Sequence, residues 1–207
     1  MEPTIFVRGN AEKTLPPDEA HIALYIESDA AEYAGACEKS ADDERLLRAC
    51  LTDAGFAAQQ LRTRDYGVSA RYEQRQLPGG GSGSVFAGYR CSHTLCLVFL
   101  LRDDALARAL GALAGCKAKP RFDVSFVLSD PKSAQEALLA DVCADALRQA
   151  QVLAQASGAR LGRLLHIEYG ASGEPREPAM LMARSAPEIS PQDVKLRETA
   201  AFTWELL

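Results

Sequence analysis

The sequence lacks a long hydrophobic run. Its longest apolar stretch, LCLVFLL at residues 95–101, is short, whereas a helix that crosses a bilayer needs about 20 apolar residues. The N-terminal segment, MEPTIFVRGN, also lacks the basic start and the apolar stretch of a secretory signal. We therefore expect no insertion into a membrane, and the sequence as it stands predicts a cytoplasmic protein.

Basic residues are not in surplus either. The chain has 28 acidic side chains against 23 Lys and Arg side chains, which gives a formal net charge of -5 at pH 7. A protein that follows the phosphates of a nucleic acid needs the opposite balance, because its cationic side chains replace the counterions. The charge balance therefore predicts that nucleic acid is not a partner.

The six cysteines lack the close, even spacing of a disulfide framework; they are Cys37, Cys50, Cys91, Cys96, Cys116 and Cys143. Cys37 and Cys50 fall within one predicted helix, where their separation of about 20 Å prevents them from pairing with each other. Cysteines scattered among Ala and Leu are typical of small buried side chains in a reducing compartment.

Motifs for metal binding and catalysis are also missing. In CSHTLC, residues 91–96, a strand would direct Cys91 and His93 to one face and Cys96 to the other, so three ligands do not converge. The glycine-rich LPGGGSGS lacks the Lys-Ser/Thr ending of a P-loop and precedes a strand. His21 and His166 have no partner in ligand spacing. We predict no catalytic residue, no cofactor and no metal.

Hydrophobic periodicity predicts the element order ββαββαβαββ. The first strands cover 4–13 and 19–28, and Asp29 with Glu32 forms a predicted capping box for a helix that ends near Gly55. The remaining elements follow in the sequence; they are a two-stranded ribbon within 61–100 with a flexible tip at 77–84, a helix from 103 or 104 to 115, a strand at 121–129, a helix from Asp130 to Gly158, a strand at 163–169, an irregular segment at 170–191, and a last strand.

This order favours an α+β fold, a mainly antiparallel sheet with helices packed on it, because strands adjacent in sequence tend to pair. No composition break divides the 207 residues, which predicts a single domain over 1–207 or two lobes that share a core. Residues 10–18 are expected to turn the first strand into the second. There Gly9 would relieve the backbone, and Asp18 would bond to local amides.

In this order, three segments resemble the SIMPL-domain family. VRGNAEKTLPPDEAHIAL is similar to the start of that family, ADALRQAQVLAQASGARLGRLLHIEY to its Ala-rich helix and following strand, and PEISPQDVKLRETAAFTWEL to its closing strand. The individual positions that carry the likeness are Gly9, Pro17, Asp18, Gly158 and Gly162.

The resemblance implies an α+β fold without accepted catalytic residues. Some bacterial members form ring-like oligomers linked to stress responses, animal relatives act as signalling adaptors, and many bacterial members carry an export signal. A leader removed from this chain would place it in the periplasm or at the cell surface. The resemblance therefore implies a homo-oligomer, with a protein partner as a further option.

Three functions follow as hypotheses. The leading one is a non-enzymatic, self-assembling scaffold or interaction protein that uses the 61–100 ribbon, because exposed strand edges pair readily. Its candidate interface residues are Arg62, Arg64, Tyr66, Tyr72 and Tyr89, and the first four share one face if the strand is regular. The second is a small-ligand binding module with Met180, Leu181 and Met182 beside a pocket near 170–191. The third is an enzyme with a reactive cysteine.

Overall fold

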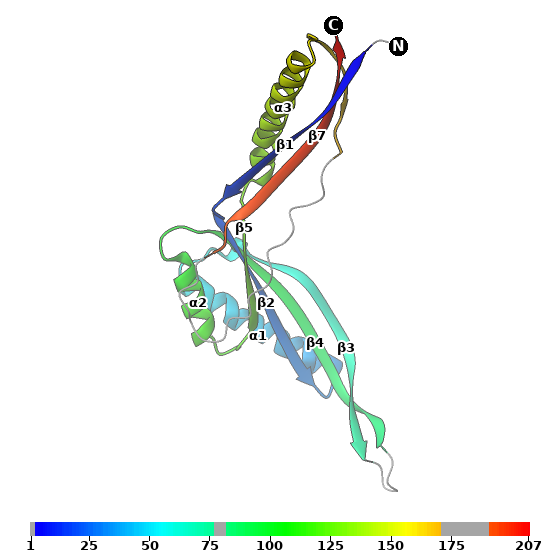
Figure 1. Ribbon diagram of the computed structural model, residues 1–207. Helices are drawn as coiled ribbons and strands as arrows, with labels where there is room; N and C mark the ends of the chain where they lie inside the picture. Colours follow the sequence, from blue (N-terminus) through cyan, green and yellow to red (C-terminus); the bar gives the residue numbers. More distant parts are fainter. Residues whose placement is uncertain (1–2, 77–81, 171–190) are drawn as a thin grey trace. The chain divides into compact units, whose positions relative to one another are not determined.

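The computed structural model describes residues 3–76, 82–170 and 191–207 (Figure 1). The strands and helices are β1 (Thr4–Leu15), β2 (Glu19–Ala30), α1 (Tyr33–Asp53), β3 (Leu61–Gln76), β4 (Ser82–Leu100), α2 (Ala105–Gly115), β5 (Arg121–Val127), α3 (Pro131–Ala156), β6 (Leu161–Glu168) and β7 (Val194–Leu206). A single 3-10 turn, Ala58–Gln60, precedes β3. The α+β class and the predicted element order are confirmed.

The chain forms two compact units, each with its own hydrophobic core. In the described residues, the first unit comprises 3–17, 128–170 and 191–207, and the second comprises 18–76 and 82–127. The chain passes from the first unit to the second at Pro17 and Asp18, and returns after Val127. Asp18 is fixed within the second unit, since its amide donates to the Val127 carbonyl at 3.2 Å and its carbonyl accepts from Leu101 at 2.7 Å.

In the first unit, α3 packs on one face of an antiparallel sheet with the order β1-β7-β6 (Figure 1). Alternate residues of β7 are buried on the α3 side, which is the pattern of a strand with one packed face. Small side chains at every fourth position of α3 meet these residues and let the helix approach the sheet closely. The core consists of Val7, Val142, Ala146, Ala150, Ala200, Phe202 and Trp204.

At Gly9 of β1 the strand approaches α3 closely. A β-carbon at this position would collide with the Val142 carbonyl oxygen and would lie 2.8 Å from the β-carbon of Ala146. On the other side of the contact, the Asn10 amide donates a 3.1 Å hydrogen bond to the Asp145 carboxylate. Gly9 therefore provides space for a helix, and the predicted role of this glycine in a turn is wrong.

The predicted turn over residues 10–18 is also too long. β1 continues in register with β7 as far as Leu15, which pairs with Val194. The change of direction is confined to residues 16–18, where two consecutive prolines disfavour a helical conformation and hold the chain extended. β1 and β2 then enter different sheets instead of pairing with each other.

The ends of α3 agree with the sequence signals. The Asp130 side chain accepts a 2.9 Å hydrogen bond from the Ser133 amide, and Pro131 follows at the first helical position. Gly158 adopts φ 77°, a left-handed conformation that ends helices and that glycine adopts without a steric penalty. Gly162 is the second residue of β6, where an added β-carbon would lie 3.0 Å from that of Glu205 in β7.

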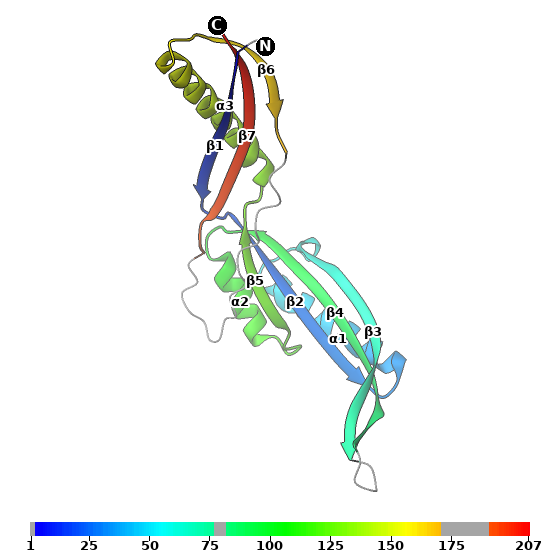
Figure 2. The same ribbon diagram turned by 45° about the vertical axis from the view of Figure 1, so that its right-hand side comes forward.

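The second unit contains an antiparallel sheet with the order β3-β4-β2-β5, and α1 and α2 cover one face of it (Figure 2). The predicted alternation of β2 is confirmed, because Ile22, Leu24 and Ile26 are buried while their neighbours are partly exposed. β4 starts at Ser82, within the predicted flexible tip, and the rest of that tip lies outside the described residues. β3 and β4 continue to pair beyond the end of β2, as far as Gln76 opposite Ser82.

The predicted capping box at Asp29 and Glu32 is wrong. α1 has Glu32 as its N-cap, with no hydrogen bond from that side chain. Asp29 belongs to β2, opposite Arg90 of β4, and its two oxygens accept from the guanidinium at 2.7 and 2.8 Å. A bidentate ion pair is stronger than a capping hydrogen bond. The Arg90 hydrogen bonds hold the pKa of Asp29 below its usual value, and Arg71 at 3.5 Å acts in the same direction.

The Gly9→Ala variant should be destabilised by about 1–3 kcal/mol, because its methyl group would force α3 away from β1. Gly67→Ala is the matched control, since a β-carbon at Gly67 in β3 meets nothing within 4 Å. Chemical denaturation followed by circular dichroism measures both. Equal denaturation midpoints for Gly9→Ala and the wild type would contradict the packing argument.

Candidate functional site

β6, an edge strand of the sheet in the first unit, carries a run of exposed apolar side chains. Leu164, Leu165 and Ile167 are 45%, 41% and 50% exposed. Leu164 lies opposite Trp204 and Ile167 opposite Phe202, on the face that carries α3, and the register shifts between Leu164 and His166. α3 lies mainly over β1 and β7, so it leaves these two side chains of β6 open to solvent.

The apolar residues of this surface are visible in the sequence, but their periodicity does not indicate that they are exposed. Apolar residues at both odd and even positions of LGRLLHIEY are typical of a strand buried on both faces. β6 is instead a partly exposed edge strand, with a shift in its pairing to β7. The apolar run was therefore visible, but only the sheet order shows that it is exposed.

The predicted interface residues on β3 do not share one face. Arg62 pairs with Cys96 and Tyr66 pairs with His93, and these partners lie on opposite faces of β4. The register shift between Thr63 and Asp65 reverses the alternation at Arg64. Arg62 and Arg64 are exposed. The prediction that both arginines share a face with Tyr66 and Tyr72 is wrong because it assumed a regular strand.

Tyr72 and Tyr89 do come together, through Phe86. The rings of Tyr72 and Phe86 are 5.8 Å apart, and those of Phe86 and Tyr89 are 5.3 Å apart, both edge to face. Tyr33, the first residue of α1, extends the series with its ring 5.7 Å from that of Tyr89. This aromatic cluster holds the ribbon against the start of α1, which is a structural role in addition to any interface.

His93 is 5% exposed on the α1 side of the sheet, and less buried polar side chains surround it. The Nε2 atom of His93 lies 3.0 Å from the Thr63 hydroxyl, and Nδ1 lies 3.8 Å from a Glu44 oxygen. The Tyr66 ring packs edge to face on the imidazole at 5.1 Å. Burial lowers the pKa of His93, and the negative charge of Glu44 acts in the opposite direction.

Two cysteines border this cluster. The neighbouring Cys91 and Cys37 thiols raise the pKa of Tyr66. Cys91 and His93 are both buried on the helix side of β4, whereas Cys96 is on the opposite face, as predicted. Among the described residues, no group of three or more His, Cys, Asp or Glu side chains is arranged to hold a metal ion.

The thiols do not show the environment of a catalytic cysteine. A nucleophilic cysteine needs a depressed pKa, which comes from nearby positive charge or a helix N-terminus. Burial instead raises the pKa of both Cys96 and Cys116. This direction disfavours the thiolate at two of the six positions and weakens the reactive-cysteine hypothesis.

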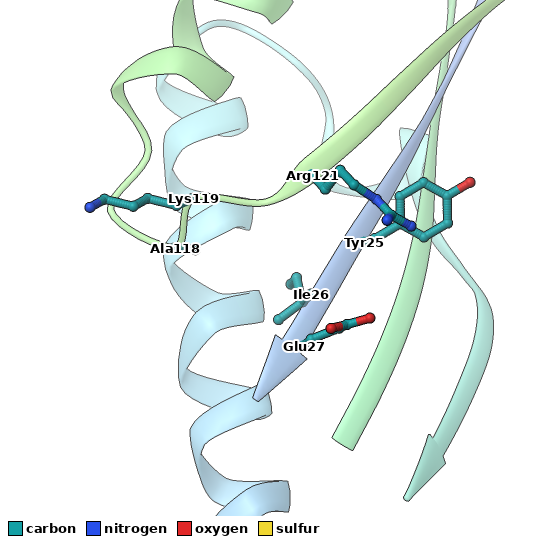
Figure 3. A pocket seen from close by; sticks show the side chains of 6 residues that line it. All are labelled: Tyr25, Ile26, Glu27, Ala118, Lys119 and Arg121. Atoms are coloured by element: carbon teal, nitrogen blue, oxygen red, sulfur yellow. The ribbon is translucent and has the colours of Figure 1, made fainter. Parts of the chain in front are cut away.

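A shallow pocket of about 200 Å³ lies where β5 begins beside β2 (Figure 3). Its lining residues are Tyr25, Ile26, Glu27, Ala118, Lys119 and Arg121. The Arg121 guanidinium lies over the Tyr25 ring at 4.7 Å (Figure 3). Typical small-molecule sites enclose about 300–1,000 Å³, so this pocket is small for one. The predicted pocket with Met180, Leu181 and Met182 lies outside the described residues.

The free energy of unfolding should fall as the pH is lowered below about 6.5, because His93 has a lower pKa in the folded chain than the ordinary value of the unfolded chain. The unfolded chain then binds the proton more readily. The His93→Gln variant should show a shallower pH dependence. His166→Gln, on exposed β6, is the control and should keep the wild-type slope. Urea denaturation between pH 7.5 and 5 measures this, and equal slopes for all three proteins would refute the assignment.

Comparison with family models identifies the family of the chain. In the part of the chain that the structure describes, no helix combines the length and apolarity that crossing a membrane requires. A search of curated proteins found no match. The family model SIMPL, described as a protein of unknown function (DUF541), matches residues 5–204, which include both units. The chain therefore belongs to the SIMPL family.

Proposed function

We propose that the protein is a non-enzymatic scaffold or interaction protein that associates with copies of itself through β6. The observation that carries this proposal is the exposed apolar edge formed by Leu164, Leu165 and Ile167. An edge strand offers unpaired backbone donors and acceptors, and apolar side chains beside them favour pairing with another strand.

The sequence of β6 also suits pairing with a second copy. In an antiparallel pair that places Leu164 of one strand opposite Ile167 of the other, Arg163 lies opposite Glu168. The pair is two-fold symmetric, so both contacts occur twice. Opposite charges and apolar side chains in directly opposed positions each stabilise a strand pair. Arg163 is exposed and reaches Glu205 only at 3.5 Å, so it can turn to a new partner at little cost.

The other candidate edge, β3, is less suited to pairing. Its exposed residues include Arg62, Arg64 and Asp65, and charged side chains are a common protection of edge strands against association. Register shifts near the start of β3 and between Arg71 and Tyr72 also bend the strand away from a flat edge. The ribbon stays a predicted interface through its aromatic side chains, and the experiment below separates the two surfaces.

The test is the absolute mass in solution, by light scattering after size exclusion, over a wide range of protein concentrations with reductant present. We expect an assembly of fixed size for the wild type. Ile167→Lys should shift it to the monomer, because a buried, unpaired ammonium group at the interface is costly. Val152→Lys is the control, since Val152 on α3 is 58% exposed and lies outside the proposed edge.

A wild-type monomer at every concentration would refute self-association. Loss of assembly in Tyr72→Lys, together with intact assembly in Ile167→Lys, would move the interface to the ribbon. Circular dichroism of each variant distinguishes a lost interface from a lost fold.

A further inference from the structure

β2 extends further than one of its two neighbouring strands. On the β4 side, β2 is paired as far as its last residue, Ala30. On the β5 side, the pairing stops at Tyr25, because β5 begins with Arg121 opposite it. Within the described parts of the chain, residues 26–30 of β2 therefore have no strand beside them on this side.

Two residues of this free segment direct their backbone groups toward the open side. Alternate residues of an antiparallel strand direct their N–H and C=O groups to opposite neighbours. The Asp18 carbonyl accepts a hydrogen bond from the residue after β4, and the Ala30 carbonyl points at Gly88 of β4, where an added β-carbon would collide with it. Even-numbered residues of β2 thus face β4. The backbone groups of Glu27 and Asp29 face the open side.

The side chains of these two residues are held in place from the neighbouring strand. Arg90 of β4 donates to both carboxylate oxygens of Asp29 at 2.7 and 2.8 Å and lies 3.1 Å from a Glu27 oxygen. Bidentate pairing of this kind fixes geometry as well as adding energy. A strand edge that is already fixed loses little conformational freedom when another strand is added.

The pocket of about 200 Å³ provides room beside this edge, with Ile26 and Glu27 on one side and Ala118 and Lys119 on the other (Figure 3). The chain enters β5 from α2 through a turn, in which Lys119 adopts a left-handed φ of 47° and Pro120 follows without an N–H group. A strand added beside Glu27 in line with β5 meets this turn. It therefore has to end there.

Arg121 supplies a positive charge where the added strand would end. Its guanidinium lies over the Tyr25 ring at 4.7 Å, and among the described residues it has no acidic partner. The Lys119 side chain points away from that ring (Figure 3). A strand antiparallel to β2 runs in the same direction as β5, so its C-terminal end is the one beside Arg121. A C-terminal carboxylate has the charge and the planar shape that a guanidinium binds.

We propose that the free segment of β2 binds the C-terminal residues of an extended peptide from a partner protein. The peptide adds as an antiparallel strand, and Arg121 binds its carboxylate. The last peptide residue pairs with Glu27, and the residue two positions earlier pairs with Asp29. Main-chain hydrogen bonds provide the affinity of such an added strand, and the captured carboxylate fixes its register. The site belongs to the second unit and is independent of self-association through β6.

The test titrates the full-length protein into a peptide of sequence Thr-Val-Thr-Val-Thr, which carries an N-terminal fluorescein and a free C-terminal carboxylate, and follows fluorescence anisotropy. We expect saturable binding. Amidation of the C-terminus should weaken binding about tenfold, because a hydrogen bond to a charged group is lost. Arg121→Gln should weaken binding of the carboxylate peptide by a similar factor and leave binding of the amide unchanged. Arg102→Gln, an exposed arginine after the end of β4, is the control and should bind both peptides as the wild type does.

Methylation of single peptide nitrogens tests the strand pairing without a change in the protein. Methylation of the last nitrogen, which donates to the Glu27 carbonyl, should abolish binding. Methylation of the penultimate nitrogen, which points away from β2, should preserve it. The proposal is overturned by no binding at the highest protein concentration, by equal binding of the carboxylate and amide peptides, or by equal effects of the two methylations. The peptide series decides the matter even where Arg121→Gln fails to fold.

Discussion

An open sheet has two edge strands. The way this chain covers or exposes its edge strands determines which apolar side chains remain at its surface. In the first unit β7 is the central strand, and β1 and β6 are the edges. α3 packs closely on β1 and β7, which Gly9 makes possible, and so it cannot also cover β6. The apolar side chains of β6 stay exposed as a result. The close approach at Gly9 and the exposed edge are thus two consequences of one packing arrangement.

The order of elements could be predicted because it depends on local patterns. Ile22, Leu24 and Ile26 alternate in β2, and Asp130 and Gly158 mark the ends of α3 through their own backbone and side-chain chemistry. The pairing of β1 with β7 could not be predicted in the same way. Thr4 and Glu205 face each other from opposite ends of the chain, and no local pattern shows that these strands form a separate sheet. Sequence reasoning therefore paired β1 with its neighbour in the chain.

The prediction that four interface residues of β3 share one face was wrong for a related reason. Strand faces follow from a period of two only while the ladder is regular, and one extra residue reverses every face after it. The shift near Arg64 separates Arg62 from Tyr66, and Tyr66 then packs on His93. The role of Asp29 could not be predicted from local sequence for a similar reason, because the pairing of β2 with β4 places Arg90 opposite it. The local sequence permits several roles for a side chain such as Asp29, and the pairing of distant strands determines which role it takes.

The two units therefore use their side chains in opposite ways. In the second unit, polar side chains of neighbouring strands contact one another: His93 shares a hydrogen bond with Thr63, and Asp29 pairs with Arg90. These contacts join neighbouring strands of one sheet. The first unit exposes apolar side chains on β6, an edge strand of the sheet that its described residues form. An unpaired apolar edge gains by contact with another chain, so the physical case for association rests on the first unit.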